Sequence, residues 1–340
     1  MDAVNVVAVV GGCAPERRRY ARRLALADGR MLVPATALTL TPDPAEMAAT
    51  LSRRAEPASG AVVEFTADID ATALIGALTH PESGIRLTGL VCVVDATHLL
   101  DDLNRTDHIR TRSPRAISDL TAIALLTAMQ LEYASSIVLV NWAALETPRL
   151  SLTMALISHL SPRARLRLHR EGIEVLEDQA TYSSAQERPG WIGILNSDFA
   201  PHMTDRRVSA LRYEHVRPLH PARLTALLDR IERGGFGLVI RSAGFCRLAT
   251  RPQATVRWEH VGRTISLFPL EEDGRIDDGG ELLAIGQELA IIGVDLRLAA
   301  LRAAFDDAAL SDGELAAGPR LWSTFPDTFP AWRSVPDHSD

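Results

Sequence analysis

The chain has 340 residues, of which 46% are hydrophobic and 23% charged, as is typical of soluble globular proteins. This length is enough for two domains that each bury a core of their own. The formal net charge of -7 argues against a protein that binds nucleic acid through a broadly basic surface, so we expect no DNA partner.

The cysteine and lysine inventory excludes several kinds of chemistry. Cys13, Cys92 and Cys246 show no metal-ligand spacing, and Cys13 and Cys92 lie too far apart in sequence to suggest a pair. All 36 basic residues are arginine. A Schiff-base enzyme and a phosphate loop with its usual lysine are therefore excluded, because arginine's planar fork does not reproduce the compact lysine charge.

The chain shows no signal-peptide pattern and no apolar run long enough to cross a bilayer. We therefore expect a cytoplasmic protein without a membrane partner.

The first half of the chain alternates short apolar runs with helical patterns. Buried strands are predicted at 5–10, 60–64, 89–94 and 136–141, and helices at 17–26, 44–55, 70–79, 119–132 and 149–160. Alternation of this kind predicts an α/β domain, over residues 1–181, with a parallel sheet covered on both faces.

The second half shows a different order of elements. Residues 182–205 are rich in Ser, Pro, Gly and Asn and are interpreted as a linker. Strands are then predicted at 210–215, 237–240, 254–260, 264–268 and 288–294, with helices at 220–233 and 297–307. This order predicts a small α+β domain over 206–332, with helices on one face of a sheet, and a flexible tail at 333–340. The acidic stretch 271–281 is interpreted as a solvated loop.

Residues 9–20, VVGGCAPERRRY, join an apolar strand to a helix through a glycine turn, which is how a phosphate-binding loop begins. Gly11 stands at the first glycine of that motif. Arg17 and Arg18, however, stand where the lysine and the Mg²⁺-binding hydroxyl belong. Pro15 lacks a backbone N–H, and Glu16 would repel a phosphate, so the loop has the outline of a nucleotide site without its chemistry.

Four ordered blocks resemble one known family. RPLHPARL (217–224), GLVIRSAGFCRLATRP (237–252), GQELAIIGVDL (286–296) and LSDGELAAGPRLWSTFPDTFPAW (310–332) are similar to the C-terminal domain of the CobW-type family, which comprises P-loop GTPases, many of them zinc-responsive metal chaperones. GAVVEFTADID, VCVVDATHLL and QLEYASSIVLVN resemble that family's switch segment, its buried acidic strand and its approach to the guanine site.

The resemblance implies a degenerate P-loop NTPase-like domain followed by a CobW C-terminal domain. It places the remains of a nucleotide site at eight positions: Gly11, Gly12, Arg17, Arg18, Glu64, Thr66, Asp70 and Asn141. The guanine-binding aspartate is replaced by Ala144, and the γ-phosphate-sensing glycine by Ala67. The GTP and Mg²⁺ that the family binds therefore have no complete motif here, and we expect no catalytic residue and no cofactor.

The family's zinc-binding cysteines are also missing. The matching segment, 34–43, has Ala35 and Leu38 at the two cysteine positions. Thiolates give such sites their zinc affinity, so we expect no metal site. Asp95, His98 and the acidic residues after them are interpreted as ordinary surface groups.

Two other groups of residues draw attention. Arg163, Arg165, Arg167 and His169 alternate along a predicted strand, which indicates either a solvated strand end or a small patch for an acidic partner or RNA backbone. In the second domain, Arg217, His220 and Pro221 form a family-typical motif. We interpret His220 as a packing and capping residue, and the tail aromatics Trp322, Phe325, Phe329 and Trp332 as anchors.

These features favour a non-catalytic protein that binds a protein partner. Within the family the chain is most similar to the branch that recruits a ribosome hibernation factor under zinc limitation, which implies that factor and the small ribosomal subunit as partners. That branch generally keeps its cysteines. Two alternatives stay open: a GTP-dependent zinc metallochaperone, and a scaffold or regulator of a paralogous metal chaperone.

Overall fold

The computed structural model describes residues 3–111, 120–170, 181–183, 188–270 and 286–330. The chain divides into two compact units, Met1–Val208 with Val261–Thr264, and Ser209–His260 with Ile265–Asp340. Each unit is described by itself. Across the described ranges, no helix is long and apolar enough to cross a membrane. The predicted acidic loop at 271–281, Trp332 and the tail at 333–340 lie outside the described residues.

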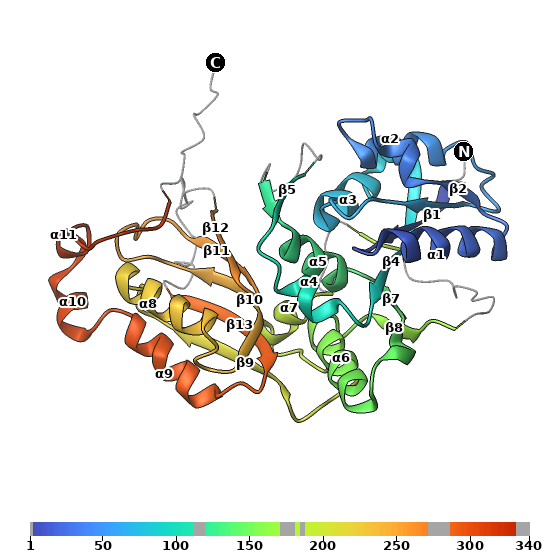
Figure 1. Ribbon diagram of the computed structural model, residues 1–340. Helices are drawn as coiled ribbons and strands as arrows, with labels where there is room; N and C mark the ends of the chain where they lie inside the picture. Colours follow the sequence, from blue (N-terminus) through green and yellow to red (C-terminus); the bar gives the residue numbers. More distant parts are fainter. Residues whose placement is uncertain (1–2, 112–119, 171–180, 184–187, 271–285, 331–340) are drawn as a thin grey trace, which may run out of the picture. The chain divides into compact units, whose positions relative to one another are not determined.

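The first unit is built on a six-stranded sheet in which every pairing is parallel (Figure 1). In sheet order the strands are β2 (Met31–Val33), β3 (Ala61–Glu64), β1 (Val4–Val10), β4 (Ile85–Asp95), β7 (Ser136–Val140) and β8 (Arg165–Leu168). The four central strands β3, β1, β4 and β7 are rich in valine, and β3 and β7 are buried along their whole length. The predicted α/β class is therefore confirmed.

Helices connect these strands. They are α1 (Ala14–Ala27), α2 (Pro44–Ser52), α3 (Ala71–Leu78), α4 (Leu99–Leu103), α5 (Ile123–Glu132), α6 (Thr147–Leu160) and α7 (Gly190–Leu195), with short 3₁₀ turns η1 (Ala35–Leu38), η2 (Pro81–Ser83) and η3 (Trp142–Ala144). Tyr20, Ala21 and Leu24 of α1 pack on strand valines to form one core cluster. Burial of this apolar face stabilises the unit by roughly 25 cal/mol for each Å² removed from water.

The register of the sheet gathers the predicted site at one edge. Val9 lies beside Glu64, Val10 beside Cys92, and Asp95 beside Val140. The carboxyl ends of β1, β3, β4 and β7 therefore meet, and the loop after β1 lies among them. In open parallel sheets this is the edge at which ligands bind.

Two features of the first unit differ from the sequence prediction. The segment interpreted as a linker, 182–205, contains α7, and both Tyr182 and Trp191 are buried. Tyr182 donates its hydroxyl to the Tyr133 carbonyl at 2.8 Å. The described part of this segment therefore packs into the first unit, because its aromatic residues find apolar partners despite its polar composition.

The second difference is a small hairpin that the sequence did not predict. Strands β5 (His108–Arg110) and β6 (Leu120–Ala122) pair antiparallel, and α5 begins only at Ile123, after the predicted start at 119. Three-residue strands carry too little pattern for period-2 alternation to be recognised.

The second unit contains a five-stranded sheet with the order β12 (Thr264–Pro269), β11 (Val256–Val261), β10 (Leu238–Cys246), β13 (Gln287–Val294) and β9 (Val208–His215). Its core joins the sheet to α8 (Pro221–Glu232) and α9 (Leu298–Ala308) through Trp258, Leu227 and Phe305. Short helices α10 (Asp312–Ala317) and α11 (Pro319–Trp322) follow. The predicted α+β domain is confirmed.

Candidate functional site

The loop between β1 and α1 is shorter than a phosphate cradle needs. Helix α1 already begins at Ala14, so that only Gly11, Gly12 and Cys13 lie between strand and helix. The backbone N–H of Arg17 bonds the Cys13 carbonyl at 3.0 Å as part of the helix. Pro15 occupies the first turn, a position where its missing N–H favours the start of a helix. Pro15 therefore removes one of the N–H groups that would surround a phosphate, and the N–H of Arg17 is already bonded within the helix.

Arg17 fills the space behind this loop with its own side chain. It is only 3% exposed, and its Nη1 donates to the Gly11 carbonyl at 2.5 Å. Its Nε lies 3.4 Å from Oε1 of Glu64, which is 2% exposed. The position where the family carries its phosphate-binding lysine thus holds an internal ion pair, with its cation turned to the protein's own carbonyl and carboxylate.

Glu64 extends this connection to a third segment. Its Oε2 accepts the backbone N–H of Ala35 at 3.3 Å. Ala35 opens the η1 turn, the segment in which the family carries its metal-binding cysteines. The β1–α1 loop, the end of β3 and the η1 turn are therefore held together through one buried carboxylate.

The other predicted switch residues have structural contacts. Asp70 is buried and caps α3, since its Oδ1 accepts from Thr72 N at 2.8 Å and from Ala73 N at 3.1 Å. Gln130 of α5 donates to the carbonyls of Ala67 and Ile69, both at 3.0 Å. Thr66 lies half-buried between β3 and α3. The segment keeps the outline of a switch, and its polar groups serve to fix it in one position.

The predicted Mg²⁺ and guanine positions are not arranged for those ligands. Arg18 points to solvent from α1. Asn141 adopts a left-handed conformation (φ 56°), and its Nδ2 donates to Oδ2 of Asp95 at 2.7 Å. Burial would raise the pKa of Asp95, but hydrogen bonds from Thr97 and Asn141 outweigh it and lower the pKa. The residues present do not fit GTP and Mg²⁺, because no side chain here replaces the family's lysine, hydroxyl or aspartate.

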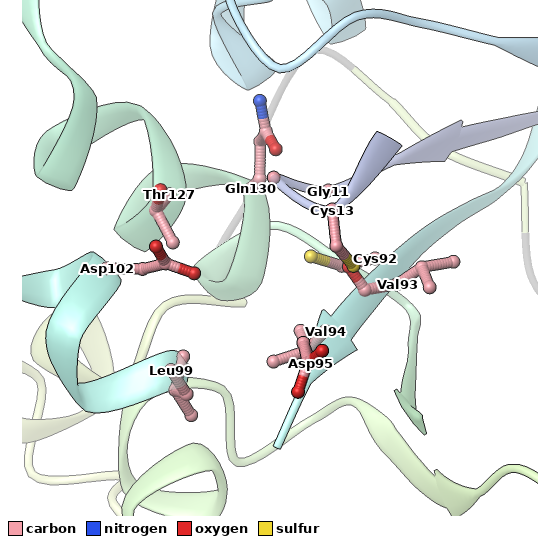
Figure 2. A pocket seen from close by; sticks show the side chains of 11 residues that line it. Gly11, Cys13, Cys92, Val93, Val94, Asp95, Leu99, Asp102, Thr127 and Gln130 are labelled. Carbon is pink, nitrogen blue, oxygen red and sulfur yellow. The ribbon is translucent and has the colours of Figure 1, made fainter. Parts of the chain in front are cut away.

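A small hollow lies beside the loop, between the ends of β1 and β4 and helices α4 and α5 (Figure 2). Its cavity volume is about 10 Å³, which is about what one water molecule needs. Gly11 and Gly12 form one side of it, and Thr127 and Gln130 another. Four side chains of metal-ligating type also line it: Cys13, Cys92, Asp95 and Asp102.

The two cysteines of this hollow were not expected to be neighbours. Cys13 donates its thiol to the Val93 carbonyl at 3.6 Å, while Cys92 precedes Val93 on β4. Burial, followed by the charges of Glu16 and Asp95, raises the pKa of Cys13 to about 11. Burial, followed by the Cys13 thiol, raises the pKa of Cys92 well above its ordinary value. Their separation in sequence gave no indication that both line one hollow, which they do because parallel β1 and β4 bring them to the same edge of the sheet.

The segment that replaces the family's cysteine motif is apolar. Ala35 and Leu38 of η1 are both buried. Among the residues that the structure describes, no group of three or more His, Cys, Asp or Glu side chains is arranged to hold a metal ion. The expectation of no metal remains a prediction about the protein in solution.

Part of the predicted basic strand is β8, the edge strand of the parallel sheet, which contains Arg165 and Arg167, whereas Arg163 and His169 lie just outside it. Arg163 pairs with Asp198 at 2.7 Å, and the Nε2 of His169 lies 3.4 Å from Arg23 Nη1. Arg165 and Arg167 also have polar partners. The expected arrangement of all four basic groups on one strand is therefore only partly found, and their proposed RNA contact stays a prediction.

In the second unit, the residues that follow α9 pack against the rest of the domain. Arg217 pairs with Asp312, and His220 stacks on Phe325 with ring centroids 4.3 Å apart. Trp322 is buried, and its Nε1 donates to the Glu314 carbonyl at 2.7 Å. Phe329 packs against the core. The anchoring role of these three aromatic residues is confirmed.

One detail of this motif differs from the prediction. His220 stands at the N-cap of α8, but its side chain makes no capping hydrogen bond. Its Nδ1 is buried without a hydrogen-bond partner. The ring stacks on Phe325 instead. Pro221 begins the helix, as proline commonly does.

Residues 208–309 match the family of the cobalamin synthesis protein cobW C-terminal domain. Over 289 residues, the chain is 24% identical to the "Zinc-regulated GTPase metalloprotein activator 1" of Dictyostelium discoideum, covering 77% of this chain and 59% of that protein. It is also 24% identical over 286 residues to the "Zinc chaperone Rv0106" of Mycobacterium tuberculosis, covering 75% and 64%. The chain thus spans about 60% of the length of these curated relatives.

A solved structure, that of the Zn(II)-bound YjiA GTPase from E. coli, aligns with 91% of this chain and 100% of its own at a TM-score of 0.40 and 13% identity. The match to the CobW C-terminal domain over residues 208–309 lies almost entirely in the second unit, and the similarity to the curated relatives, which covers about three quarters of the chain, extends into the first unit.

Proposed function

We propose that this chain is a metal-handling protein of the CobW type that acts by binding a protein partner and does not hydrolyse GTP. Two separate lines of observation support the two parts of this proposal. The names of the relatives support the role in metal handling. The residues of the first unit support the absence of GTP hydrolysis.

The names of the relatives support a role in metal supply. One is called a zinc-regulated GTPase metalloprotein activator and the other a zinc chaperone, and each aligns over about three quarters of this chain. A protein of this kind would deliver or withhold a metal ion through contact with a client protein. Residues 208–309 match the model of the CobW C-terminal domain.

The observation that carries the second part is the buried Arg17–Glu64 pair. Electrostatic stabilisation by a single aimed donor is worth about 3–4 kcal/mol in a transition state. In this chain the cation at the lysine position is already neutralised by Glu64 and already donates to Gly11. A triphosphate would have to displace it from both partners. No hydroxyl at position 18 and no aspartate at position 144 would compensate.

The second candidate is a GTP-dependent zinc metallochaperone, which the names of the two relatives favour. This candidate requires that Arg17 separate from Glu64 when the nucleotide binds and that its guanidinium then contact the phosphates. It also requires guanine recognition without the usual aspartate. The two candidates therefore differ in one measurable property, which is GTP turnover by the pure protein.

The test compares the wild-type chain with a restored-loop variant. In this variant Pro15→Ala, Glu16→Gly, Arg17→Lys and Arg18→Thr rebuild the motif that starts at Gly11. We expect no Mg²⁺-dependent GTP hydrolysis by the wild type and a gain of nucleotide binding in the variant. Hydrolysis by the wild type at ordinary GTPase rates, with loss in Arg17→Ala, would establish the second candidate instead.

The identity of the partner is proposed from the family branch that the sequence resembles. That branch recruits a ribosome hibernation factor under zinc limitation, so the proposed partners are such a factor and the small ribosomal subunit. A chain of net charge -7 would reach a ribosome more readily through a protein than through bare RNA. A scaffold that regulates a paralogous metal chaperone is the alternative.

The partner is tested by affinity capture from zinc-starved and zinc-replete cells. Leu315 and Leu321 are each 39% exposed on α10 and α11 of the second unit. We expect a Leu315→Glu/Leu321→Glu variant to lose the partner, and an Arg163→Ala/Arg165→Ala/Arg167→Ala variant to keep it at low salt. Loss of the partner by the arginine variant, with the leucine variant keeping it, would indicate that the partner binds the first unit. Capture of a paralogous chaperone without ribosomal proteins would favour the scaffold.

A further inference from the structure

The solvent-facing side of α1 carries a dense cluster of positive charge on an acidic chain. We call it the basic face and define it by four exposed arginines and one exposed leucine: Arg18, Arg19, Arg22, Arg23 and Leu26. We propose that the basic face binds an acidic segment of a partner protein. This surface belongs to the first unit and plays no part in the docking proposed for α10 and α11 of the second.

The spacing of these residues places them on one side of the helix. Arg18 and Arg22, like Arg19 and Arg23, are four positions apart and therefore lie one turn above the other. Leu26 stands four positions after Arg22 and three after Arg23, so it lies next to both. Its side chain is 83% exposed. The basic face thus combines two rows of guanidinium groups with one apolar side chain.

The chain itself does not neutralise this charge. Among the described residues, Arg18, Arg19 and Arg22 form no ion pair, and neither does Glu16, the acidic residue of the helix. Like charges four positions apart repel one another and destabilise a helix. A negatively charged partner would relieve that repulsion, and the planar fork of arginine suits carboxylates, which it can bind with two parallel hydrogen bonds.

The basic face continues past the end of β8. The Nη1 of Arg23 lies 3.4 Å from the Nε2 of His169, and the exposed Arg170 follows in the chain. The guanidinium of Arg170 lies 5.8 Å from the ring centre of Trp142. A bound acidic segment would therefore meet a further cation beyond α1.

A protein segment fits this surface better than RNA or a membrane does. Surfaces that bind single-stranded RNA combine cations with exposed aromatic rings, whereas Tyr20, the aromatic residue of α1, is only 4% exposed. A helix that lies on a bilayer inserts its apolar side, but Ala21 and Leu24 already pack that side of α1 into the core. Leu26, among the arginines, offers a contact to an apolar side chain within an acidic segment.

The test follows the fluorescence anisotropy of a labelled peptide of Glu-Glu-Leu-Glu repeats as the full chain is added. We expect the wild type to bind it, with affinity that falls as salt is raised. A variant in which all four arginines of the basic face are replaced by glutamine should bind at least about tenfold more weakly, because four exposed ion pairs are lost. Leu26→Ser should weaken binding of this peptide and leave binding of a Glu-Glu-Ser-Glu peptide unchanged.

The matched control removes the same charge from scattered places in the first unit. It replaces four other exposed arginines by glutamine: Arg54, Arg86, Arg110 and Arg149. This variant should bind the peptide like the wild type, and far-UV circular dichroism shows whether both variants are folded.

Three results would overturn the proposal: no binding by the wild type, equal loss of binding in both glutamine variants, or tighter binding of oligouridine or phosphatidylserine vesicles than of the peptide. No readout involves GTP, α10 or α11, so the outcome is independent of the proposed function.

Discussion

Replacing Arg17 tests the buried pair in the β1–α1 loop. Arg17→Met keeps most of the side-chain volume and removes the cation, so that Glu64 stays buried with Ala35 N as a donor and without its counter-charge. Breaking one partner of a buried ion pair costs about 3–5 kcal/mol. With a urea dependence of about 3 kcal/mol per M, the unfolding midpoint of the first unit should fall by roughly 1–2 M.

The assay is urea unfolding followed by far-UV circular dichroism. Arg18→Met is the matched control, since Arg18 is exposed on the same helix, and it should shift the midpoint by little. The double variant Arg17→Met/Glu64→Met should regain most of the loss, because replacing both charges by apolar groups is often neutral or stabilising. If Arg17→Met and Arg18→Met unfold alike, the ion pair does not hold this loop, and the reasoning is refuted.

Two further predictions concern particular residues. Gly11 has φ 134°, and a Cβ there would lie 2.1 Å from the Val93 carbonyl oxygen, so Gly11→Ala should lower the unfolding free energy by at least about 2 kcal/mol. A Cβ on Gly12 would meet open space, so Gly12→Ala should leave the urea midpoint unchanged. Equal midpoints for the two variants would refute this prediction. Burial, then Arg223, lowers the pKa of His220, so the folded chain favours the neutral ring, and unfolding free energy should fall as pH drops below 6.5. This component should be absent in His220→Asn, and a pH profile identical to the wild type would contradict it.

Much of the fold could be predicted from local pattern. The apolar runs predicted at 5–10, 60–64 and 136–141 correspond to the parallel strands β1, β3 and β7, whose residues are almost all buried, and the apolar composition of such strands is easy to recognise. The helix predicted at 70–79 is α3, and the structure shows that the Asp70 side chain caps its start. Strands β2, β5 and β6 have three residues each, too few for any period to appear.

Only part of the candidate site could be predicted from the sequence. The replacement of lysine by Arg17 was visible, because a motif with fixed spacing has a fixed place for it. Its pairing with Glu64 was not, since the two residues are 47 positions apart and meet only through the register of β1 and β3. The meeting of Cys13 and Cys92 depends in the same way on the pairing of β1 with β4. Contacts that depend on how strands pair in a sheet leave no recognisable pattern in a single sequence.

The central claim is that Arg17, at the position of the phosphate-binding lysine, is held by Glu64 and the Gly11 carbonyl and so cannot serve a nucleotide. Its most direct test is equilibrium binding of Mg²⁺-GTP to the purified full-length chain, by titration calorimetry with the restored-loop variant measured beside it. We predict no binding heat for the wild type at millimolar GTP, and measurable binding for the variant. Micromolar binding of GTP by the wild type, with Arg17 and Glu64 unchanged, would contradict it.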